Sequence, residues 1–382
     1  MRIKVTPKIL SWARQRANLN QNDLLKRFPK LYEWEQGITF PTLKQLEKYA
    51  KKTHQPIGVF FLPEPPKEEL PIPDFRSMGS TSYGQPSPDL LETIYICQQR
   101  QEWYRDFAII HGHERFNFIG SKSINDDVIQ VGNEITDTIH FNLSQRQHVR
   151  TWADTFRLFV EKVEEQGILV MVSGVVGNNN YRKLDPEEFR GFVLADNLAP
   201  LIFINSNDTI SAKIFTLAHE LAHLWLGESG ISDTRINKIP NDRIERWCNQ
   251  VAAELLVPMT NLKDVYNVEN DLQDELGQLA RRYKVSTLVI LRRLLDMGAL
   301  NEETFWNTWN AELKRLLEIE RTGRGGGDFY RTLGVRISKR FARALVISTL
   351  EGQTLFRDTF KMLGIKKNTT FYEIANRLGF RE

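Results

Sequence analysis

The sequence has few of the features that mark secreted or membrane-embedded proteins. It contains two cysteines, Cys97 and Cys248, far apart in a chain of 382 residues. Two such cysteines cannot build a disulfide framework, so we expect both thiols to be reduced. No apolar run approaches the roughly 20 residues of a membrane-spanning helix. The first twenty residues also lack the apolar core of a signal peptide, so we expect a cytoplasmic protein without membrane contacts.

Composition and length describe a globular protein with more than one domain. Hydrophobic residues make up 41% of the chain and charged residues 26%, with a mean hydropathy of −0.39. A chain of this length exceeds what one hydrophobic core commonly organises. Residues 1–66 and 312–382 each carry a net charge of +7, whereas the whole chain carries +3. Basic ends around an acidic middle indicate separate modules, whose charge reflects either solvated helix faces or an anionic partner.

Two predicted segments precede the middle of the chain. Residues 1–62 are expected to form a small helical bundle, with helices at 7–18, 20–28 and 41–53. The prolines that follow cannot continue a helix, so residues 63–86 are predicted to be a stiff extended linker.

The remainder is predicted to combine helices with a small sheet, which makes the chain an α+β protein. Short runs rich in β-branched and aromatic residues predict three strands, at 168–172, 191–196 and 201–205. A long helix is expected from Ser87, and further helices at 151–167, 213–227, 241–256, 270–283 and 286–298. Beyond residue 300 the pattern is helical, apart from a glycine run at 323–327 that is typical of a flexible connector.

The segment His219-Glu220-Leu221-Ala222-His223 carries the strongest functional signal. Residues four apart lie on one face of a helix, so both imidazoles can bind one metal ion. Glu220 is then placed to accept a proton from the water that the metal activates, without being a ligand itself. The other positions of this helix are apolar, and burying two histidines and a glutamate there without a metal would be costly. We therefore predict a zinc site with Glu220 as general base.

A catalytic zinc ion usually has three protein ligands, so a third donor is expected. Glu228, Glu245 and Glu254 are the candidates in the sequence that follows. Glu228 comes directly after Gly227 and has little chain with which to fold back. Glu245 lies on the next predicted helix, one turn before Asn249, whose amide is suited to supporting a ligand from outside. Glu254, on the same helix, remains the alternative.

These residues resemble the ImmA/IrrE-type metallo-endopeptidases, in which a helix-turn-helix module often precedes the peptidase domain. The resemblance rests on FTLAHELAHLWLG at 215–227 and ERWCNQVAAELLVP at 245–258. WEQGITFPTLKQLEKYAKK, PDFR at 73–76 and GGGDFYRTLG near the end are similar to the long members, so the resemblance covers nearly the whole chain. It implies that the zinc ligands are His219, His223 and Glu245.

The family implies a zincin-like fold, a thermolysin-like half-domain with a small sheet over the zinc helix. Its outer strand would bind an extended peptide through main-chain hydrogen bonds, and both 191–196 and 201–205 are candidates for that strand. Stabilisation of an oxyanion would need a further donor, for which Tyr181, Arg182 and Asn205 remain open.

The resemblance divides the chain into four parts. We expect a helix-turn-helix-like (XRE-like) module at 1–62, the linker at 63–86, a zinc metallopeptidase domain at 87–300 and a basic helical region at 301–382.

The first module departs from the pattern of a sequence-reading helix-turn-helix. Only Pro29 to Tyr32 separate its second helix from the segment that starts at Glu33, about four residues fewer than in similar modules. Lys26, Arg27 and Lys30 can still contact phosphates, which predicts salt-dependent DNA binding with little sequence preference. A degenerate module that serves for docking is the alternative to sequence-specific DNA binding.

The HExxH segment and the resemblance together predict a gluzincin-like zinc endopeptidase. The resemblance implies a protein substrate, in particular a transcriptional repressor in a stress-response or mobile-element setting. Two alternatives stay open: a non-catalytic, antitoxin-like component of a toxin–antitoxin pair, and a DNA-binding transcription regulator with the peptidase-like domain as sensor.

Overall fold

The structure is a computed structural model that describes residues 2–17, 19–66, 69–75, 86–232, 242–320 and 336–380. The chain divides into two compact units. The smaller comprises Met1–Pro71 and Ser82–Ile94, and the larger comprises Ile72–Thr81 and Tyr95–Glu382. The boundary falls within the long helix α5 (Pro88–Ile110), which therefore contributes residues to both units.

The N-terminal part of the smaller unit is helical and has its own hydrophobic core. Its elements are α1 (Pro7–Arg16), α2 (Gln21–Leu25), α3 (Leu31–Glu35), α4 (Leu43–Lys52) and the 3-10 helix η1 (Ile57–Phe61). Thr42 and Gln45 form a capping box that starts α4, because each side chain binds the other residue's backbone N–H. Trp34, Tyr49 and Phe60 are buried together in the core.

The second helix is shorter than the sequence pattern predicts. It ends at Leu25 rather than near Phe28, and α3 begins at Leu31. Proline disfavours helical backbone in the residue before it, so Pro29 limits any continuation of α2 through Phe28.

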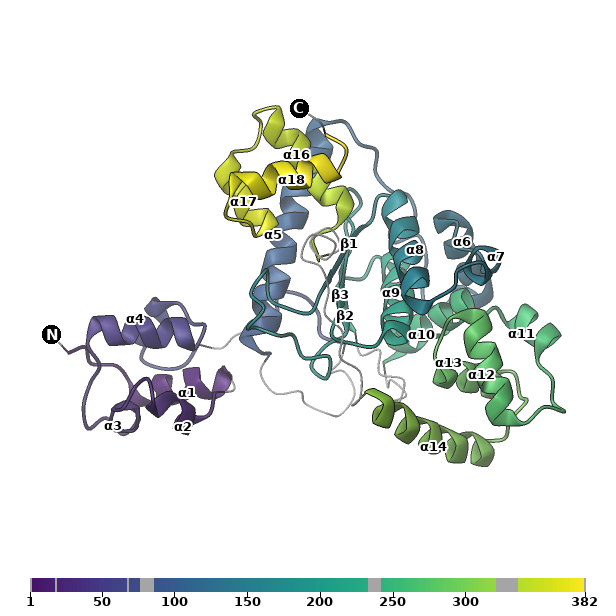
Figure 1. The fold of residues 1–382 in the computed structure, drawn as a ribbon, viewed down its shortest axis with the longest axis horizontal. Helices are drawn as coiled ribbons and strands as arrows, with labels where there is room; N and C mark the ends of the chain where they lie inside the picture. Colours follow the sequence, from purple (N-terminus) through teal and green to yellow (C-terminus); the bar gives the residue numbers. More distant parts are fainter. Residues whose placement is uncertain are drawn as a thin grey trace. The chain divides into compact units, whose positions relative to one another are not determined.

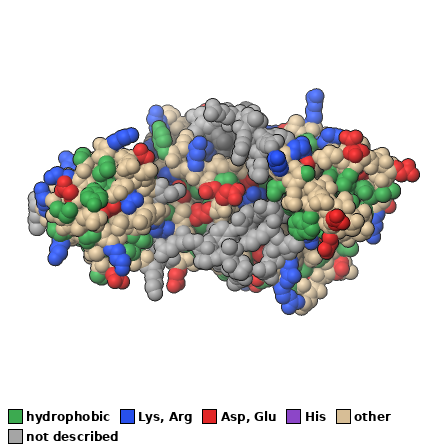
Figure 2. Space-filling view, turned by 90° about the horizontal axis from the view of Figure 1, so that it is seen from below, with side chains coloured by type: hydrophobic (Ala, Val, Ile, Leu, Met, Phe, Trp, Pro, Cys, Tyr) green, Lys and Arg blue, Asp and Glu red, His purple; other side chains and the backbone are tan. Residues whose placement is uncertain are grey.

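Figure 2 shows Lys and Arg side chains projecting from the surface of the N-terminal helices, at the left of the view.

The larger unit contains a four-stranded mixed sheet with the order β1-β3-β2-β4. Its strands are β1 (Leu169–Ser173), β2 (Gly191–Leu194), β3 (Leu201–Asn205) and β4 (Gly230–Ser232). Strands β1 and β3 pair in parallel, whereas β2 is antiparallel to both β3 and β4. The three strands predicted from sequence are present, and β4 is an additional strand.

Helices cover both faces of this sheet, which explains why its strands are buried throughout. On one face, Val170 and Ile202 belong to the same core as Leu217 of α9 (Ile210–Leu226). On the other face, the Sδ atom of Met171 lies 4.0 Å from the Sγ atom of Cys97 on α5. Figure 1 shows the sheet between α5 and α9.

Most of the other helices of the larger unit were predicted from the sequence, whereas those at 128–139, 143–147 and 259–265 were not. These other helices are α6 (Val128–Ile139), α7 (Leu143–Gln147), α8 (Trp152–Glu165), α10 (Arg243–Leu256), α11 (Met259–Val265), α12 (Leu272–Tyr283), α13 (Thr287–Asp296), α14 (Glu302–Glu320), α16 (Lys339–Leu350), α17 (Phe356–Leu363) and α18 (Asn368–Arg377). A small sheet among many helices confirms the predicted α+β class.

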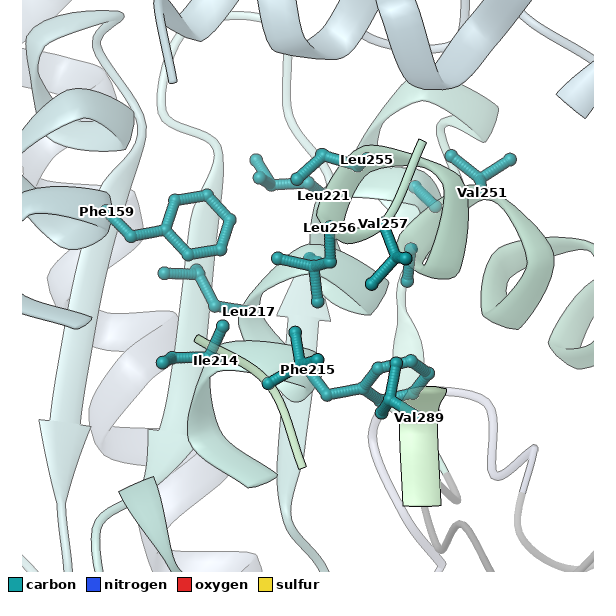
Figure 3. Close-up of a cluster of buried hydrophobic side chains, with 14 of the residues drawn as sticks. Phe159, Ile214, Phe215, Leu217, Leu221, Val251, Leu255, Leu256, Val257 and Val289 are labelled. Atoms are coloured by element: carbon teal, nitrogen blue, oxygen red, sulfur yellow. The ribbon is translucent and has the colours of Figure 1, made fainter. Parts of the chain in front are cut away.

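The main core lies where α9 and α10 cross beneath the sheet. Leu217 and Leu221 of α9 meet Leu255 and Leu256 of α10, and Phe159 of α8 closes one side (Figure 3). All five side chains are at most 1% exposed. This packing holds α9 and α10 in a fixed relation, and the candidate site is built on these two helices.

The C-terminal helices α16 to α18 are joined to other elements of the larger unit by side-chain hydrogen bonds. The guanidinium group of Arg100 on α5 donates hydrogen bonds to the backbone oxygen of Met362, at 2.9 and 3.1 Å. Asn178 donates to the backbone oxygens of Leu363 and Gly364. The glycine run at 323–327 and the GGGDFYRTLG segment lie outside the described residues.

Cys97 and Cys248 are both free and buried. No helix within the described ranges is long and apolar enough to cross a membrane.

Candidate metal centre

Helix α9 presents the two histidines of the HExxH segment. The Thr209 side chain accepts the backbone N–H of Ala212 and caps the start of the helix. Gly227, with φ of 73°, provides the left-handed residue that ends it. His219 and His223 are one turn apart and 0% exposed, so their side chains share the face that is turned towards α10.

Helix α10 supplies the residues that meet this face. The carboxylate of Asp242 accepts the backbone N–H groups of Ile244 and Glu245, which fixes the first turn of the helix. Glu245 lies in that turn and is 1% exposed, and Asn249 follows one turn later. The packing of α10 on α9 therefore carries a carboxylate and an amide to the two imidazoles.

Three side chains that can bind a metal ion converge between the helices. His223 Nε2 lies 3.0 Å from His219 Nε2 and 3.0 Å from Glu245 Oε1. His219 Nε2 lies 3.4 Å from Glu245 Oε2. The ligand atoms of His219, His223 and Glu245, which we call the trio, all lie within 4.8 Å of one another. Two imidazole nitrogens and a carboxylate oxygen at this spacing fit a metal ion, because each can direct a lone pair to one point.

Asn249 determines which ring nitrogen of His219 carries the proton. His219 Nδ1 lies 2.9 Å from Asn249 Oδ1. A carbonyl oxygen only accepts hydrogen bonds, so Nδ1 carries the proton and donates it. In the neutral ring Nε2 then keeps its lone pair and faces His223 and Glu245.

The electrostatics of the trio reflect burial and the single negative charge among its members. Although burial opposes the shift, Glu245 raises the pKa of His219. Burial lowers the pKa of His223. The two imidazoles hold the pKa of Glu245 well below its usual range, against the effect of burial. Glu245 is thus an anion paired with the rings.

Glu220 lies beside the trio in a closed environment. It is 0% exposed, and burial raises its pKa to about 8. Its Oε2 accepts a hydrogen bond of 3.2 Å from the hydroxyl of Ser232, whereas Oε1 has no hydrogen-bond partner in the described part of the chain. A Cβ at Gly191 of β2 would lie 2.9 Å from that Oε1, so the absence of a side chain there leaves room for the carboxylate.

The structure separates the three candidates for a third donor. Glu245 contacts both imidazoles, as described above. Glu254 instead pairs with Arg293 and accepts the backbone N–H of Met259. Glu228 is exposed beyond the end of α9.

The candidates for an oxyanion donor differ in their surroundings. Tyr181 is 99% exposed, and Arg182 is buried. The amide of Asn205 is engaged, because it donates to the backbone oxygen of Phe189 and accepts the N–H of Asn207.

Ser232 and Gly191 were missed by the sequence analysis, and so was Phe75, whose ring stacks on His223. Strand β4, which carries Ser232, has only three residues and shows no periodic signal. PDFR at 73–76 drew attention only as a family likeness, without a role.

Both strands considered for peptide binding are already paired along both edges. Strand β3 lies between β1 and β2, and β2 lies between β3 and β4. Among the strands of the described residues, β1 and β4 are therefore the outer ones.

Comparisons with known proteins agree with the position of this site. Residues 163–295 match the family profile of the IrrE N-terminal-like domain (Peptidase M78). Residues 337–377 match a domain of unknown function, DUF8813. Over 104 residues the chain is 34% identical to the radiation response metalloprotease IrrE of Deinococcus deserti.

The matches cover part of this chain. The alignment covers 26% of this chain and 37% of that relative, so the chain spans little more than a third of its length. The resemblance of the N-terminal helices to a helix-turn-helix lies outside the matched residues and stays a prediction. Residues 163–295, which hold the sheet, both site helices and every residue of the trio, are thus similar to the IrrE N-terminal-like domain.

Proposed function

We propose that the protein is a zinc-dependent endopeptidase of the gluzincin type that cleaves a protein partner. The observation that carries the proposal is the convergence of His219, His223 and Glu245 beside a buried Glu220. Two histidines, one carboxylate and an adjacent glutamate that is not a ligand form the donor and base set of hydrolytic zinc sites. A domain similar to that of a metalloprotease contains this set, which supports the same conclusion.

In this proposal each residue has a separate task. His219, His223 and Glu245 hold the zinc ion, and Asn249 keeps His219 in the tautomer that leaves Nε2 free. The bound ion would supply Lewis acidity for the attack of water on a peptide carbonyl. Glu220 takes up a proton at Oε1, the oxygen without a partner, and passes it to the leaving amine. Ser232 holds the other oxygen of Glu220 in place.

The substrate we propose is a regulatory protein, in particular a transcriptional repressor, in a stress-response or mobile-element setting. The similar protein of Deinococcus deserti is described as a radiation response metalloprotease, which favours a stress setting. The proposal places the peptidase domain at 87–300 in a cytoplasmic chain, with the linker at 63–86 and the basic region at 301–382.

The proposal is tested by comparing new protein N-termini in host cells that express wild type or E220Q. Both proteins should bind zinc, because Glu220 is not a proposed ligand. We expect a small set of N-termini that appears with wild type and is absent with E220Q. Equal sets from the two proteins, at equal zinc content, would exclude Glu220 as the base.

A second function concerns the N-terminal helices, since Lys26, Arg27 and Lys30 are all exposed. We propose that the XRE-like module at 1–62 binds DNA through phosphates with little sequence preference. Binding to a duplex should weaken with salt, and K26A/R27A/K30A should reduce the slope of log affinity against log salt by about 3.

A matched control replaces three exposed lysines of α4, as K44A/K48A/K51A. If both triple variants change the slope equally, the positive charge of the module binds DNA without a defined surface. An unchanged slope in K26A/R27A/K30A excludes the proposed contacts.

A further inference from the structure

The outer edge of β4 is already occupied by a segment of the same chain. The backbone N–H of Ile231 donates to the oxygen of Pro73 at 3.0 Å, and the N–H of Phe75 donates to the oxygen of Ile231 at 3.1 Å. Asp74 and Ile231 form a parallel bridge. An open strand edge is the place where an extended peptide adds to a sheet. In this structure Pro73 to Phe75 occupy that edge of β4.

The side chain of Phe75 fits a notch beside the candidate metal centre. Its ring stacks on the ring of His223, with centroids 5.3 Å apart and planes at 18°, and it is 6% exposed. A Cβ at Gly230 would lie 2.2 Å from the ring of Phe75. Only glycine at 230 leaves space for the ring, so the notch is shaped for an aromatic side chain.

This occupied edge belongs to a closed site. Ser232, two residues beyond Gly230 on β4, contacts Glu220, and Glu220 and both histidines are 0% exposed. A side chain that is inaccessible to solvent cannot meet a peptide bond, so the site must open before a substrate reaches Glu220. The outer edge of β4 can pair with one chain at a time, so an incoming chain that pairs with β4 must replace the segment.

We propose that Pro73 to Phe75 form an intramolecular occupant of the peptide-binding edge, which an extended polypeptide bearing an aromatic side chain displaces. The assignment of this edge to a substrate rests on the proposed peptidase function. The partner pairs with β4 through its main chain and inserts its aromatic ring between Gly230 and His223. The segment thus keeps the site closed until such a chain is present.

The test measures how tightly the zinc-loaded full chain binds a fluorescent peptidyl hydroxamate, a probe that reaches the metal only in an open site. An equilibrium that keeps the site closed about 90% of the time weakens apparent affinity about tenfold. F75A should therefore bind the probe at least about tenfold more tightly than wild type. The control is F118A, because Phe118 also stacks on α9, on Trp225 at 4.6 Å, but not on a residue of the trio. F118A should bind as wild type does.

A second variant covers the case in which F75A fails to fold. G230A introduces a methyl group into the space of the Phe75 ring and should also tighten binding of the probe. The peptide PIPDFR, residues 71–76, should compete with the probe for F75A but not for G230A, whose methyl group fills the notch, and PIPDAR should compete for neither.

Probe affinities equal to wild type in the folded variants, at full zinc content, overturn the inference. Binding of the probe requires no hydrolysis, so this outcome is independent of the E220Q comparison. Tighter binding without any wild-type cleavage would leave the inference standing and remove the proposed function.

Discussion

Asn249 shapes the candidate metal centre although it is not one of its three donors. Its Oδ1 accepts the Nδ1 proton of His219, which determines the tautomer of that ring. Outer partners of this kind influence metal affinity because they orient the ligand and increase its basicity. The effect of Asn249 on metal affinity can therefore be measured by replacing this one residue.

Loss of the Asn249 amide should weaken zinc binding without abolishing it. We expect N249A to raise the zinc dissociation constant about 10- to 100-fold, measured by competition with a chelator. Q250A is the control, because Gln250 is the next residue of α10 and is exposed. Equal dissociation constants for N249A and wild type would show that Asn249 does not support His219.

We expect Glu164, at the end of α8, to make the stability of the larger unit depend on pH. Burial raises its pKa to about 7, although the Ser338 hydroxyl, which donates a hydrogen bond to it, and the charge of Lys339 oppose the shift. A carboxyl with a raised folded pKa binds its proton more tightly in the folded chain than in the unfolded one. Its contribution is therefore present below about pH 4.5 and is lost as pH rises to about 7.

We expect the wild-type free energy of unfolding to fall by up to roughly 3 kcal/mol relative to E164Q between pH 4.5 and 7.5. Urea unfolding of both proteins across this range measures the difference. E161Q is the control, since Glu161 is more exposed and pairs with Lys339. A constant difference between wild type and E164Q at all pH values would contradict the assignment.

Candidate site residues that are related by their spacing within one helix could be predicted from the sequence. His219, Glu220 and His223 follow from a spacing of four on α9, and Asn249 follows from its distance to Glu245 on α10. Ser232 and Phe75 depend on how β4 and residues 73–75 pair, and no local pattern encodes that pairing.

Helix α10 is held by buried charges at the end remote from Glu245. Arg293 donates to the backbone oxygen of Val257 at 3.0 Å and pairs with Glu254. Arg146 donates to the backbone oxygens of Leu255 and Leu256. These contacts satisfy carbonyl groups that a helix end leaves without partners, and they fix the position of α10.

Removal of Arg293 should destabilise the larger unit, because it leaves Glu254 buried without its partner. We expect R293A to lower the free energy of unfolding by about 3 to 5 kcal/mol. The neighbouring Arg292 forms a more exposed pair with Asp296, so R292A should cost less than about 1 kcal/mol. Urea unfolding distinguishes the two, and equal losses would exclude a special role for the buried pair.

Elements with a strong periodic signal were predictable, and short or non-local ones were not. Strands β1 to β3 and helices α9, α10, α12 and α13 were expected near their observed positions. Strand β4 was not expected, because its three residues are a strand only through pairing with β2. The five-residue α2 was predicted too long, because the pattern of apolar residues outweighed Pro29.

For the whole molecule, the basic ends and the acidic middle of the chain contain different structural elements. The acidic middle contains the sheet and the trio, and its residues 163–295 match the IrrE N-terminal-like profile. Most of the C-terminal helices match a separate domain of unknown function. Length and charge indicated several modules, but the pairing of residues 72–75 with the larger unit depends on contacts that composition does not record.

The most direct test of the account is the zinc dissociation constant of the full chain, measured for wild type, E245A and E228A. We predict a single zinc ion per wild-type chain. E245A should raise the dissociation constant by more than about 100-fold, because it removes a ligand rather than an outer partner. E228A should match wild type, since Glu228 is exposed beyond α9. Unchanged zinc affinity in E245A, or no zinc binding by wild type, would contradict the proposed metal centre.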